Sequence, residues 1–456
     1  MRHKIRRIHF VGIGGAGMCG LAEVMHSLGY EVSGSDAREQ PSLQRLRAAG
    51  VRIYVGHDAA NAADADCVVY SGAVPDDNPE RRAARARGAP VIPRAQMLGE
   101  VLRFKPGAAV AGTHGKTTVS SMLAAILSAA GQDPTCIIGG RFLDGGGNAR
   151  IGGGEFVVAE ADESDASFLH LRPVAAVVTN IDDDHLSSFG GDMRRLRRAF
   201  YDFLGNLPFY GAAVICADDP AAAELARAAS FVRVVRYGKS ADADARAADI
   251  RADGDEMHFT LYLAGGAYPA HLRAAGEHNV VNAAGACAMA CELGIAPAAA
   301  AAGLAHFRGV GRRLERRGEM AAAGGAAILV DDYAHHPTEI AASVAAVRGA
   351  HPRRRLVLVF QPHRYTRTRD LLDKLAAALA SGDALVLLDV YPAGETPIAG
   401  ADSDALAAIL QKRGVNIARA GGVEDAARAV GAVARDGDVV LTMGAGNIGA
   451  LPGMLQ

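Results

Sequence analysis

The sequence lacks the long apolar runs, the strong net charge and the leader pattern that mark several classes of protein. None of its apolar runs approaches the ~18–20 residues needed to cross a bilayer, so we expect no membrane insertion. The formal net charge of the 456-residue chain is −2 and no long basic face is present, which argues against nucleic acid as a partner. The first residues lack the apolar core of a signal peptide, so we expect a cytoplasmic protein.

The sequence also lacks a C-x-x-C motif, and its six cysteines are scattered along the chain. Most of them lie in apolar stretches, which indicates buried, reduced thiols rather than a zinc site. Half of the residues are hydrophobic (50%) and 21% are charged, which is enough apolar material for large packed cores. We expect about two to four domains, and a monomer or a weak homodimer.

One stretch joins an apolar run to a glycine-containing loop and then to an amphipathic helix. The run over 108–112 predicts a buried strand, and the helix that follows stops at Gly131. The loop and the first helical turn consist of Gly112, Thr113, His114, Gly115, Lys116, Thr117 and Thr118. Backbone N–H groups of such a loop bind a polyphosphate, Lys116 can reach the outer phosphates, and the Thr117 hydroxyl can ligate Mg²⁺. Val110 stands where the phosphate-loop pattern has its first glycine, so a glycine-rich turn with an exposed lysine stays open as the alternative.

An earlier glycine loop follows a predicted strand over 8–12. It contains Gly12, Gly14, Gly15, Ala16 and Gly17 and runs into a helix. Asp36 ends the next predicted strand, about 20 residues further on, as in dinucleotide-binding fingerprints. The pattern predicts a bound pyrophosphate without specifying NAD. A tight strand–helix turn with no ligand is the alternative.

Acidic residues gather behind two further predicted strands, over 156–159 and 175–179. Because like charges repel, a divalent cation is the simplest reason for two such clusters at strand ends. Oxygen ligands together with phosphate oxygens suit Mg²⁺, and Glu160 and His185 are the preferred protein ligands beside Thr117. Helix capping and solvation are the alternative for the acids.

In the C-terminal third, polar residues again follow predicted buried strands. These strands cover 328–332, 356–360, 384–388 and 438–441. Alternation of such strands with helices predicts parallel sheets covered on both faces. We therefore expect an α/β protein of three consecutive doubly wound units. They are a Rossmann-like unit (1–95), a central P-loop ATPase unit (96–310) and a second Rossmann-like unit (311–456).

Seven motifs occur in order: GIGGAGM (12–18), GTHGKTT (112–118), EADESDASF (160–168), TNIDxDH (179–185), HNxxN (278–282), DDYxHHPTE (331–339) and QPHRYxRT (361–368). Together they resemble the Mur ligase family over essentially the whole chain. The resemblance implies ATP-dependent amide ligation in peptidoglycan precursor synthesis, with ATP and Mg²⁺ as cofactors. The lactyl carboxylate of UDP-N-acetylmuramate would take the γ-phosphoryl group of ATP. The amine of L-alanine would then attack this acyl phosphate, giving the amide, ADP and phosphate.

The resemblance also implies a role for each domain and for particular residues. The first domain would bind the UDP sugar through its glycine loop, with Asp36, His57 and Ser71 near the uridine. The central domain would bind ATP through 112–118, with His278 and Asn279 at the adenine. The third domain would bring L-alanine.

Two groups of residues in the third domain would complete the site by this resemblance. Either Arg312 or Arg313 would reach the phosphates, the sequence not distinguishing them, and Arg313 and Lys116 would supply positive charge for phosphoryl transfer. Tyr333, His335, Arg364 and Arg367 would line the alanine and acyl-phosphate pocket. Guanidinium groups suit a carboxylate, and His335 could assist removal of the amine proton.

The sequence departs from the family pattern in three places. Cys19 replaces a usual Ser, Ala334 a usual Gly, and LSSFG after His185 a usual MDTYG. The rival within the family is the ligase that adds a recycled murein tripeptide to the same UDP sugar. An NAD-dependent oxidoreductase and a non-catalytic nucleotide switch leave most of the motifs unexplained.

Overall fold

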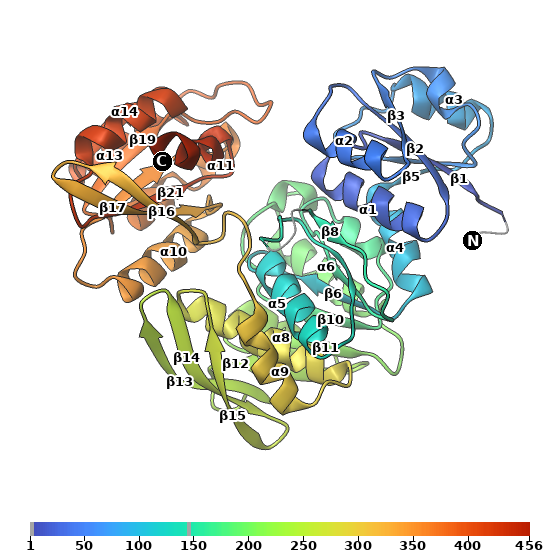
Figure 1. Cartoon of the computed structure of the whole chain (residues 1–456), viewed down its shortest axis with the longest axis horizontal. Helices are drawn as coiled ribbons and strands as arrows, with labels where there is room; N and C mark the ends of the chain where they lie inside the picture. The colour runs from blue at the N-terminus through green and yellow to red at the C-terminus, as the bar shows by residue number, and fades with distance from the viewer. Residues whose placement is uncertain (1–3, 144–146) are drawn as a thin grey trace. The chain divides into compact units, whose positions relative to one another are not determined.

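The computed structural model describes residues 4–143 and 147–456, which carry three mostly parallel sheets (Figure 1). The chain forms two compact units. The first comprises Met1–Ala248, Thr260–Ala270 and Val281–Arg308, and the second comprises Asp249–Phe259, His271–Val280 and Gly309–Gln456. The expected α/β class with three consecutive sheets is confirmed, and the domain boundaries stay predictions. Within the described residues, no helix has the length and apolar character needed to cross a bilayer.

The N-terminal sheet has the strand order β3-β2-β1-β4-β5, all parallel. Its elements are β1 (Arg7–Val11), α1 (Ala16–Ser27), β2 (Glu31–Asp36), α2 (Pro41–Ala48), β3 (Arg52–Val55), β4 (Cys67–Tyr70), α3 (Pro79–Ala86) and β5 (Val91–Pro93). The strand order reverses between β1 and β4, so the loops after these two strands meet at the topological switch point. A Cβ built on Gly12, behind β1, would lie 3.2 Å from the Cβ of Ser71, behind β4.

The central sheet has ten strands in the order β15-β14-β13-β12-β11-β10-β6-β9-β7-β8. Its strands are β6 (Gly107–Ala111), β7 (Thr135–Ile137), β8 (Ala149–Arg150), β9 (Val157–Glu160), β10 (Ala175–Val178), β11 (Ala212–Cys216), β12 (Arg233–Gly238), β13 (Ala245–Asp253), β14 (Glu256–Leu263) and β15 (Gly266–Leu272). The helices are α4 (Arg94–Phe104), α5 (Lys116–Ala129), α6 (Met193–Leu204), α7 (Pro220–Ala228), α8 (Glu277–Glu292) and α9 (Pro297–Gly303). Strand β6 pairs in parallel with both β9 and β10, so their carboxyl ends bring three loops together.

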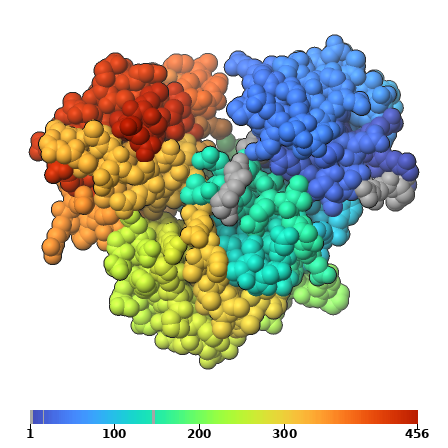
Figure 2. Space-filling model, in the orientation of Figure 1, coloured from blue at the N-terminus to red at the C-terminus, as the bar shows by residue number. Residues whose placement is uncertain are grey.

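Helix α1 joins the first two sheets within the first unit. It contacts α4, β7 and β8 as well as its own sheet, and the blue and cyan surfaces adjoin there in Figure 2. Helix α1, with the sequence AGMCGLAEVMHS, carries glycines at positions 17 and 20. A Cβ on Gly20 would lie 2.8 Å from the Cβ of Ala149 in β8, so this glycine permits the close approach.

The C-terminal sheet has the order β16-β17-β21-β18-β19-β20, with only the β16–β17 pair antiparallel. Its strands are β16 (Glu315–Ala322), β17 (Gly325–Asp332), β18 (Leu356–Phe360), β19 (Ala384–Leu388), β20 (Ile417–Ala420) and β21 (Val439–Met443). The helices are α10 (Pro337–Ala350), α11 (Tyr365–Asp370), α12 (Leu372–Leu379), α13 (Ser403–Lys412), α14 (Val423–Val433) and α15 (Leu451–Leu455). Leu356 and Leu358 pack into one core and Val357 and Val359 into another, as expected for a sheet covered on both faces.

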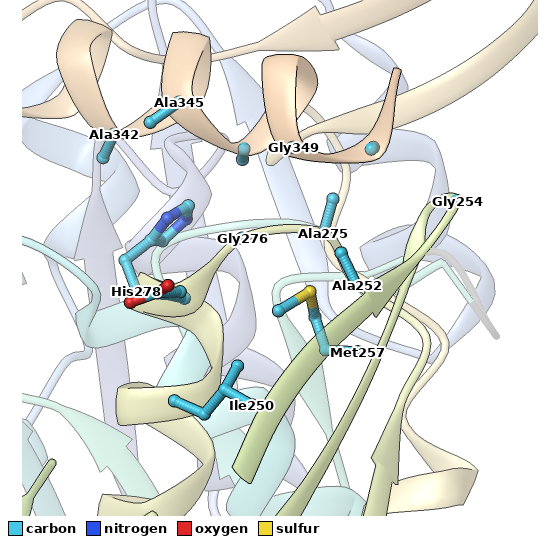
Figure 3. Close-up of a pocket in the computed structure, with 13 residues that line it drawn as sticks. Ile250, Ala252, Gly254, Met257, Ala275, Gly276, His278, Ala342, Ala345 and Gly349 are labelled. Carbon is cyan, nitrogen blue, oxygen red and sulfur yellow. The ribbon is translucent and has the colours of Figure 1, made fainter. Parts of the chain in front are cut away.

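A cavity of about 320 Å³ in the second unit lies between α10 and the start of α8 (Figure 3). Its lining is mostly apolar, with Ile250, Met257 and several alanines. His278 projects into it toward α10. The cavity therefore offers one aromatic polar ring among apolar walls.

Candidate functional site

The loop between β6 and α5 begins at Gly112, which explains why Val110 needs no glycine. Val110 is still a buried residue of β6. Gly112 has a φ of +130°, and a Cβ there would lie 2.0 Å from Thr179 Oγ1. Gly115 also has a positive φ, +83°, and caps α5 with no side-chain cap. The turn starts two residues later than in the general pattern, and the helix N-terminus still opens onto the loop.

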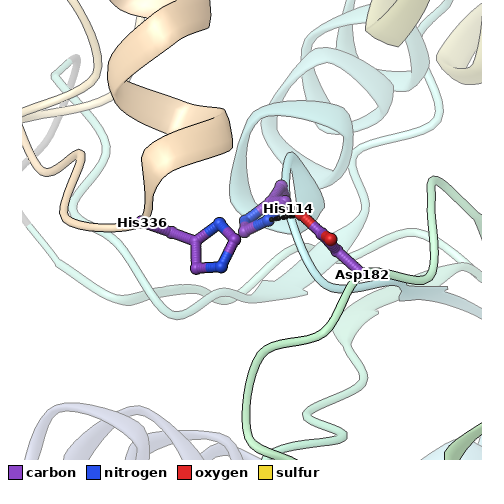
Figure 4. Close-up of side chains that lie close together, drawn as sticks. All are labelled: His114, Asp182 and His336. Atoms are coloured by element: carbon purple, nitrogen blue, oxygen red, sulfur yellow. Dashed lines mark hydrogen bonds and ion pairs between the residues drawn. The ribbon is translucent and has the colours of Figure 1, made fainter. Parts of the chain in front are cut away.

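Side chains behind β10 fix the shape of this loop. Asn180 Oδ1 accepts the His114 N–H at 2.8 Å, and Thr179 Oγ1 donates to the His114 carbonyl at 2.6 Å. Thr113 Oγ1 accepts the Asp182 N–H at 2.9 Å. The His114 ring meets Asp182, with Nε2 3.0 Å from Oδ2 (Figure 4). A loop bonded in this way holds its remaining N–H groups in place before any ligand arrives.

Lys116 lies folded against its own loop and a buried carboxylate. Its Nζ donates to the carbonyls of Gly112 at 2.6 Å and Thr113 at 3.0 Å, and to Glu163 Oε2 at 2.8 Å. Burial raises the pKa of Glu163 to about 7, although Lys116 opposes this. Burial alone would lower the pKa of Lys116, but the carboxylates of Glu163, Glu160 and Asp162 outweigh burial and raise it. Lys116 therefore stays charged.

Glu163 is a residue that the sequence reasoning missed. It stands inside the EADESD segment, but only its pairing with Lys116 across 47 positions distinguishes it from its acidic neighbours. Its side chain is 1% exposed, and Oε1 has no hydrogen-bond partner among the described protein atoms. An unpartnered buried carboxylate oxygen fits a site that receives a cation or a water.

The structure brings together two of the three predicted metal ligands. Thr117 Oγ1 lies 3.0 Å from both carboxylate oxygens of Glu160, which also accepts the Gly139 N–H. His185 follows β10 in a left-handed conformation, with φ +58°, and its Nε2 lies 3.4 Å from Asp184 Oδ2. Hydroxyl and carboxylate oxygens beside a phosphate loop fit Mg²⁺.

The first glycine loop is tied down by Asp36. The Gly14 N–H donates to Asp36 Oδ2 at 2.9 Å, so this carboxylate organises the loop. Gly15 caps α1 and has no side-chain oxygen. The first N–H groups of this helix therefore receive no hydrogen bond from a capping side chain. Of the three predicted uridine contacts, Asp36 and Ser71 thus lie beside the loop. Cys19, one of the departures, is buried in α1 with its Sγ 3.7 Å from Arg45 Nη2.

His57, the third of these, belongs to a buried polar cluster around Glu80. Its Nδ1 lies 3.1 Å from Glu80 Oε2 and 3.1 Å from Ser35 Oγ. Ser35 and Asn61 donate to Glu80 at 2.6 and 2.7 Å, and His9 Nε2 lies 3.7 Å from Oε1, an electrostatic contact. Burial would raise the pKa of Glu80, but His9, Ser35 and Asn61 together hold it at about 2. This cluster fixes the position of the His57 ring.

Arg94 also lies at the first glycine loop and was missed by the sequence reasoning. It opens α4, directly behind β5. A Cβ on Gly17 would meet its Nη1 at 3.1 Å and its Cζ at 3.3 Å, so the guanidinium packs on the loop. In the described part of the chain, this half-buried guanidinium makes no hydrogen bond or ion pair.

In the second unit, His278 and Asn279 lie in the first turn of α8, directly after Glu277. Burial, together with Arg313, lowers the pKa of His278 to about 4, so its ring is neutral at pH 7. Asn279 is buried and its Nδ2 donates to the Ala275 carbonyl at 2.8 Å. Gly276, with φ +99°, admits this turn because a Cβ there would lie 2.7 Å from the Ala346 Cβ and 2.7 Å from His278 Cε1.

The predicted alanine pocket is assembled behind β17 and β18. The Tyr333 and His335 rings meet edge to face at 5.4 Å, and the His335 and His363 rings at 5.9 Å. Arg367 Nη1 lies 3.3 Å from His363 Nδ1, and Arg364 is exposed at the start of α11 with φ +69°. His363 is a further member that was not selected from the sequence. Burial lowers its pKa to about 4.

Arg312 and Arg313 differ in what they hold. Arg312 donates to Asp331 at 3.1 Å and to the Gly444 carbonyl at 2.6 Å, and its backbone has φ +59°. Arg313 lies 3.5 Å from Glu339 Oε1, and its guanidinium lies over the Tyr333 ring at 5.2 Å. The Arg312 guanidinium lies over the same ring at 5.3 Å, so both arginines lie beside the predicted pocket, and Arg312 in addition fixes the β17–β21 edge.

Ala334, another departure from the family pattern, fits its position. It is fully buried, and its N–H donates to Asp332 Oδ1 at 2.6 Å. It is not among the described residues with a positive φ, so no glycine is required there. Burial raises the pKa of Asp332 to about 6, although Arg313 and two backbone N–H groups lower it.

Family models match nearly all of the chain. Residues 7–106 match "Mur ligase family, catalytic domain", residues 110–290 match "Mur ligase middle domain", and residues 312–446 match "Mur ligase, glutamate ligase domain".

Individual proteins match over the full length. A UDP-N-acetylmuramate–L-alanine ligase of Burkholderia pseudomallei is 54% identical over 458 residues, covering 100% of this chain and 98% of the relative. The crystal structure of a UDP-N-acetylmuramate–alanine ligase from Thermotoga maritima has a TM-score of 0.80 at 30% identity, covering 98% of both chains. A murein peptide ligase structure from Psychrobacter arcticus has a TM-score of 0.70 at 26% identity, covering 99% of this chain and 98% of that one.

The two ends of α5 provide a matched pair of glycine variants. Gly115 and Gly131 have similar φ values, +83° and +76°, but a Cβ on Gly115 would lie 2.9 Å from Asn282 Oδ1, whereas nothing lies within 4 Å at Gly131. We expect Gly115→Ala and Gly131→Ala each to lower the free energy of unfolding by about 1 kcal/mol, because alanine is strained in the left-handed conformation. Only Gly115→Ala should weaken ATP binding, by at least about tenfold in calorimetric titration. Equal ATP affinity in both variants would contradict the role given to the loop.

The Glu80 cluster predicts a pH-dependent stability. Because the pKa of Glu80 is lowered from 4.5 to about 2, its contribution is present above about pH 4.5 and is lost as the pH falls toward 2. We expect Glu80→Gln to lower the unfolding free energy by about 2 kcal/mol at pH 7 and by much less at pH 3. Glu39→Gln, at an exposed ion pair, is the control and should change little. The free energy of unfolding is measured by urea unfolding at both pH values. If Glu80→Gln lowers it equally at pH 7 and pH 3, the ionised carboxylate is not the cause of the loss.

Proposed function

The chain belongs to the Mur ligase family, and we propose that it joins L-alanine to the lactyl carboxylate of UDP-N-acetylmuramate at the expense of ATP. The observation that carries this proposal is the 54% identity to a ligase of that name over the full length of both chains. The products are UDP-N-acetylmuramoyl-L-alanine, ADP and phosphate, in peptidoglycan precursor synthesis. Since the reaction uses ATP and a UDP-linked sugar, we place it in the cytoplasm. We assign no nucleic-acid partner to it.

The first chemical step is phosphoryl transfer. A lactyl carboxylate oxygen attacks the γ-phosphorus, the bond to the β-phosphate oxygen breaks, and ADP leaves. Lys116 is already charged and held at the loop by Glu163 and two carbonyls. Phosphate oxygens replace some of these acceptors when ATP binds, so positive charge is in place before the reaction.

Thr117, Glu160 and His185 are the residues we propose for Mg²⁺, with the unpartnered oxygen of Glu163 close to Lys116. When bound, the ion neutralises phosphate charge and orients the γ-phosphoryl group. Arg313 is our choice over Arg312 for the phosphates. The choice is supported by the two structural hydrogen bonds that already occupy the Arg312 guanidinium.

His278 and Asn279 are proposed to receive the adenine. The neutral His278 ring and the apolar walls of the adjoining cavity suit a flat heteroaromatic base. A cavity of about 320 Å³ is large enough for one nucleobase.

The second step is attack of the alanine amine on the acyl phosphate. A C–N bond forms, phosphate leaves and the amine gives up a proton. We propose that Arg364 and Arg367 hold the alanine carboxylate beside Tyr333. His335 is suited to take the proton, because its Nδ1 lies 3.0 Å from the Tyr333 carbonyl. That contact assigns the ring proton to Nδ1 and leaves Nε2 as the basic nitrogen.

Arg94 is proposed to hold the pyrophosphate of the UDP sugar at the first glycine loop. Its support is a guanidinium that packs on Gly17 beside the start of α1 and makes no hydrogen bond or close ion pair in the described residues, although its charge helps to lower the pKa of Asp162. Guanidinium groups bind phosphate through two parallel N–H donors. The loop N–H groups, Asp36, His57 and Ser71 would position the rest of the nucleotide.

This role for Arg94 predicts a selective kinetic defect. We expect Arg94→Ala to raise the KM for UDP-N-acetylmuramate by roughly 10–100-fold, as for a lost charge-assisted hydrogen bond, with the ATP KM nearly unchanged. Arg103→Ala, on the exposed face of the same helix, should match the wild type. A parallel rise of both KM values in Arg94→Ala would indicate a structural role instead.

The overall proposal is tested by substrate-dependent ADP release. We expect ADP only when ATP, UDP-N-acetylmuramate and an amino acid are all present, with the highest kcat/KM for L-alanine in a set that includes glycine and L-serine. The murein tripeptide serves as the competing substrate. Preference for the tripeptide would select the rival ligase, and absence of any amino-acid-dependent ADP would reject ligase activity.

A further inference from the structure

Strands β14 and β15 form a hairpin at the edge of the central sheet, and its outer face gathers three metal-binding side chains. In β14, Met257 and Phe259 are buried while Glu256 and His258 are only partly buried. Residues two apart on a strand share a face, so Glu256 and His258 point to the same side. His271 of β15 meets them there. All three residues belong to the second compact unit.

The three side chains are already close together. Glu256 Oε2 lies 2.6 Å from His271 Nε2, and the His258 and His271 rings stack with centroids 4.7 Å apart and an interplanar angle of 20°. One ligand atom from each residue lies within 4.8 Å of the other two. Ligands of a tetrahedral zinc ion lie roughly 3.4 Å apart, given Zn–N bonds of about 2.1 Å. Zinc binding would require the two nearly parallel rings to turn until one nitrogen of each faces the same point as the Glu256 carboxylate.

From this geometry we infer a zinc site formed by Glu256, His258 and His271. Two imidazoles and one carboxylate are a common protein ligand set for Zn²⁺, and a fourth position stays open for water. Imidazole nitrogens favour Zn²⁺ over Mg²⁺, so this site is chemically different from the oxygen-rich one at Thr117 and Glu160. None of the three residues takes part in the proposed ligation reaction, so the site is independent of it.

Zinc here would link the edge strand β15 to β14. Edge strands rest on a single neighbour, and a metal ion bound by both strands fixes their register. Arg273 opposes cation binding, since its Nε lies 3.9 Å from Glu256 Oε1. Its replacement should therefore strengthen the site.

The test is zinc titration of the full-length protein against a chromophoric chelator. Excess Mg²⁺ occupies oxygen-rich sites, and a reductant that contains no thiol keeps the cysteines reduced without binding zinc. We expect His258→Asn and His271→Asn each to weaken zinc binding by at least about tenfold, the cost of losing even a supporting group in such sites. His306→Asn, an exposed histidine outside the cluster, should bind like the wild type. Unchanged affinity in the His258→Asn/His271→Asn double variant would overturn the site.

Three further measurements extend the test, and the first two do not depend on a loss that misfolding could cause. Arg273→Gln should bind zinc several-fold more tightly, and weaker binding would count against the site. Bound Cu²⁺ should show coupling to two imidazole nitrogens by paramagnetic resonance in the wild type, and to fewer in either histidine variant. Retention of the same two-nitrogen signal in both variants would show that the metal sits elsewhere. Zinc should also raise the melting temperature of the wild type but not of the double variant.

Discussion

The ion pair between Lys116 and Glu163 is the interaction on which the proposed nucleotide site depends. A charged ammonium group in a buried loop is costly unless it is paired, and the partner must still give way to phosphate. Glu163 meets both needs, because burial keeps its pKa near 7 and one of its oxygens has no other described partner. The pair therefore keeps the lysine charged and in place without binding it irreversibly.

The buried sheets explain why many polar side chains can lie close together in the loops without destabilising the fold. The inner parallel strands, such as β6, β10, β18 and β21, are buried on both faces, and polar groups are left to the loops at the carboxyl ends of the strands. The first sheet supplies a glycine loop tied by Asp36, with Arg94 packed on it. The central sheet supplies the loop fixed by Asn180, and the third supplies the Tyr333–His335 cluster. Each group of side chains is built by its own sheet.

Many of the helices and strands and part of the candidate site could be predicted from the sequence, because they depend on local sequence patterns. The helix expected to stop at Gly131 and the strand expected at 356–360 lie where the structure has α5 and β18. Residues Thr117 and Glu160 meet as expected from neighbouring strand ends. Glu163, Arg94 and Glu80 could not be found in this way, because their partners lie 47, 77 and 45 positions away in the chain. The antiparallel strands β14 and β15 carry no glycine or charge motif and were also missed.

In the proposed reaction the carboxylate is activated by phosphorylation before the amine attacks it. The most direct measurement uses UDP-N-acetylmuramate with a heavy oxygen isotope in both lactyl carboxylate positions. In that experiment the phosphate released with ADP should contain one heavy oxygen, because the acyl C–O bond breaks in the second step. Phosphate free of the isotope, together with an amide formed at full rate, would contradict an acyl-phosphate intermediate.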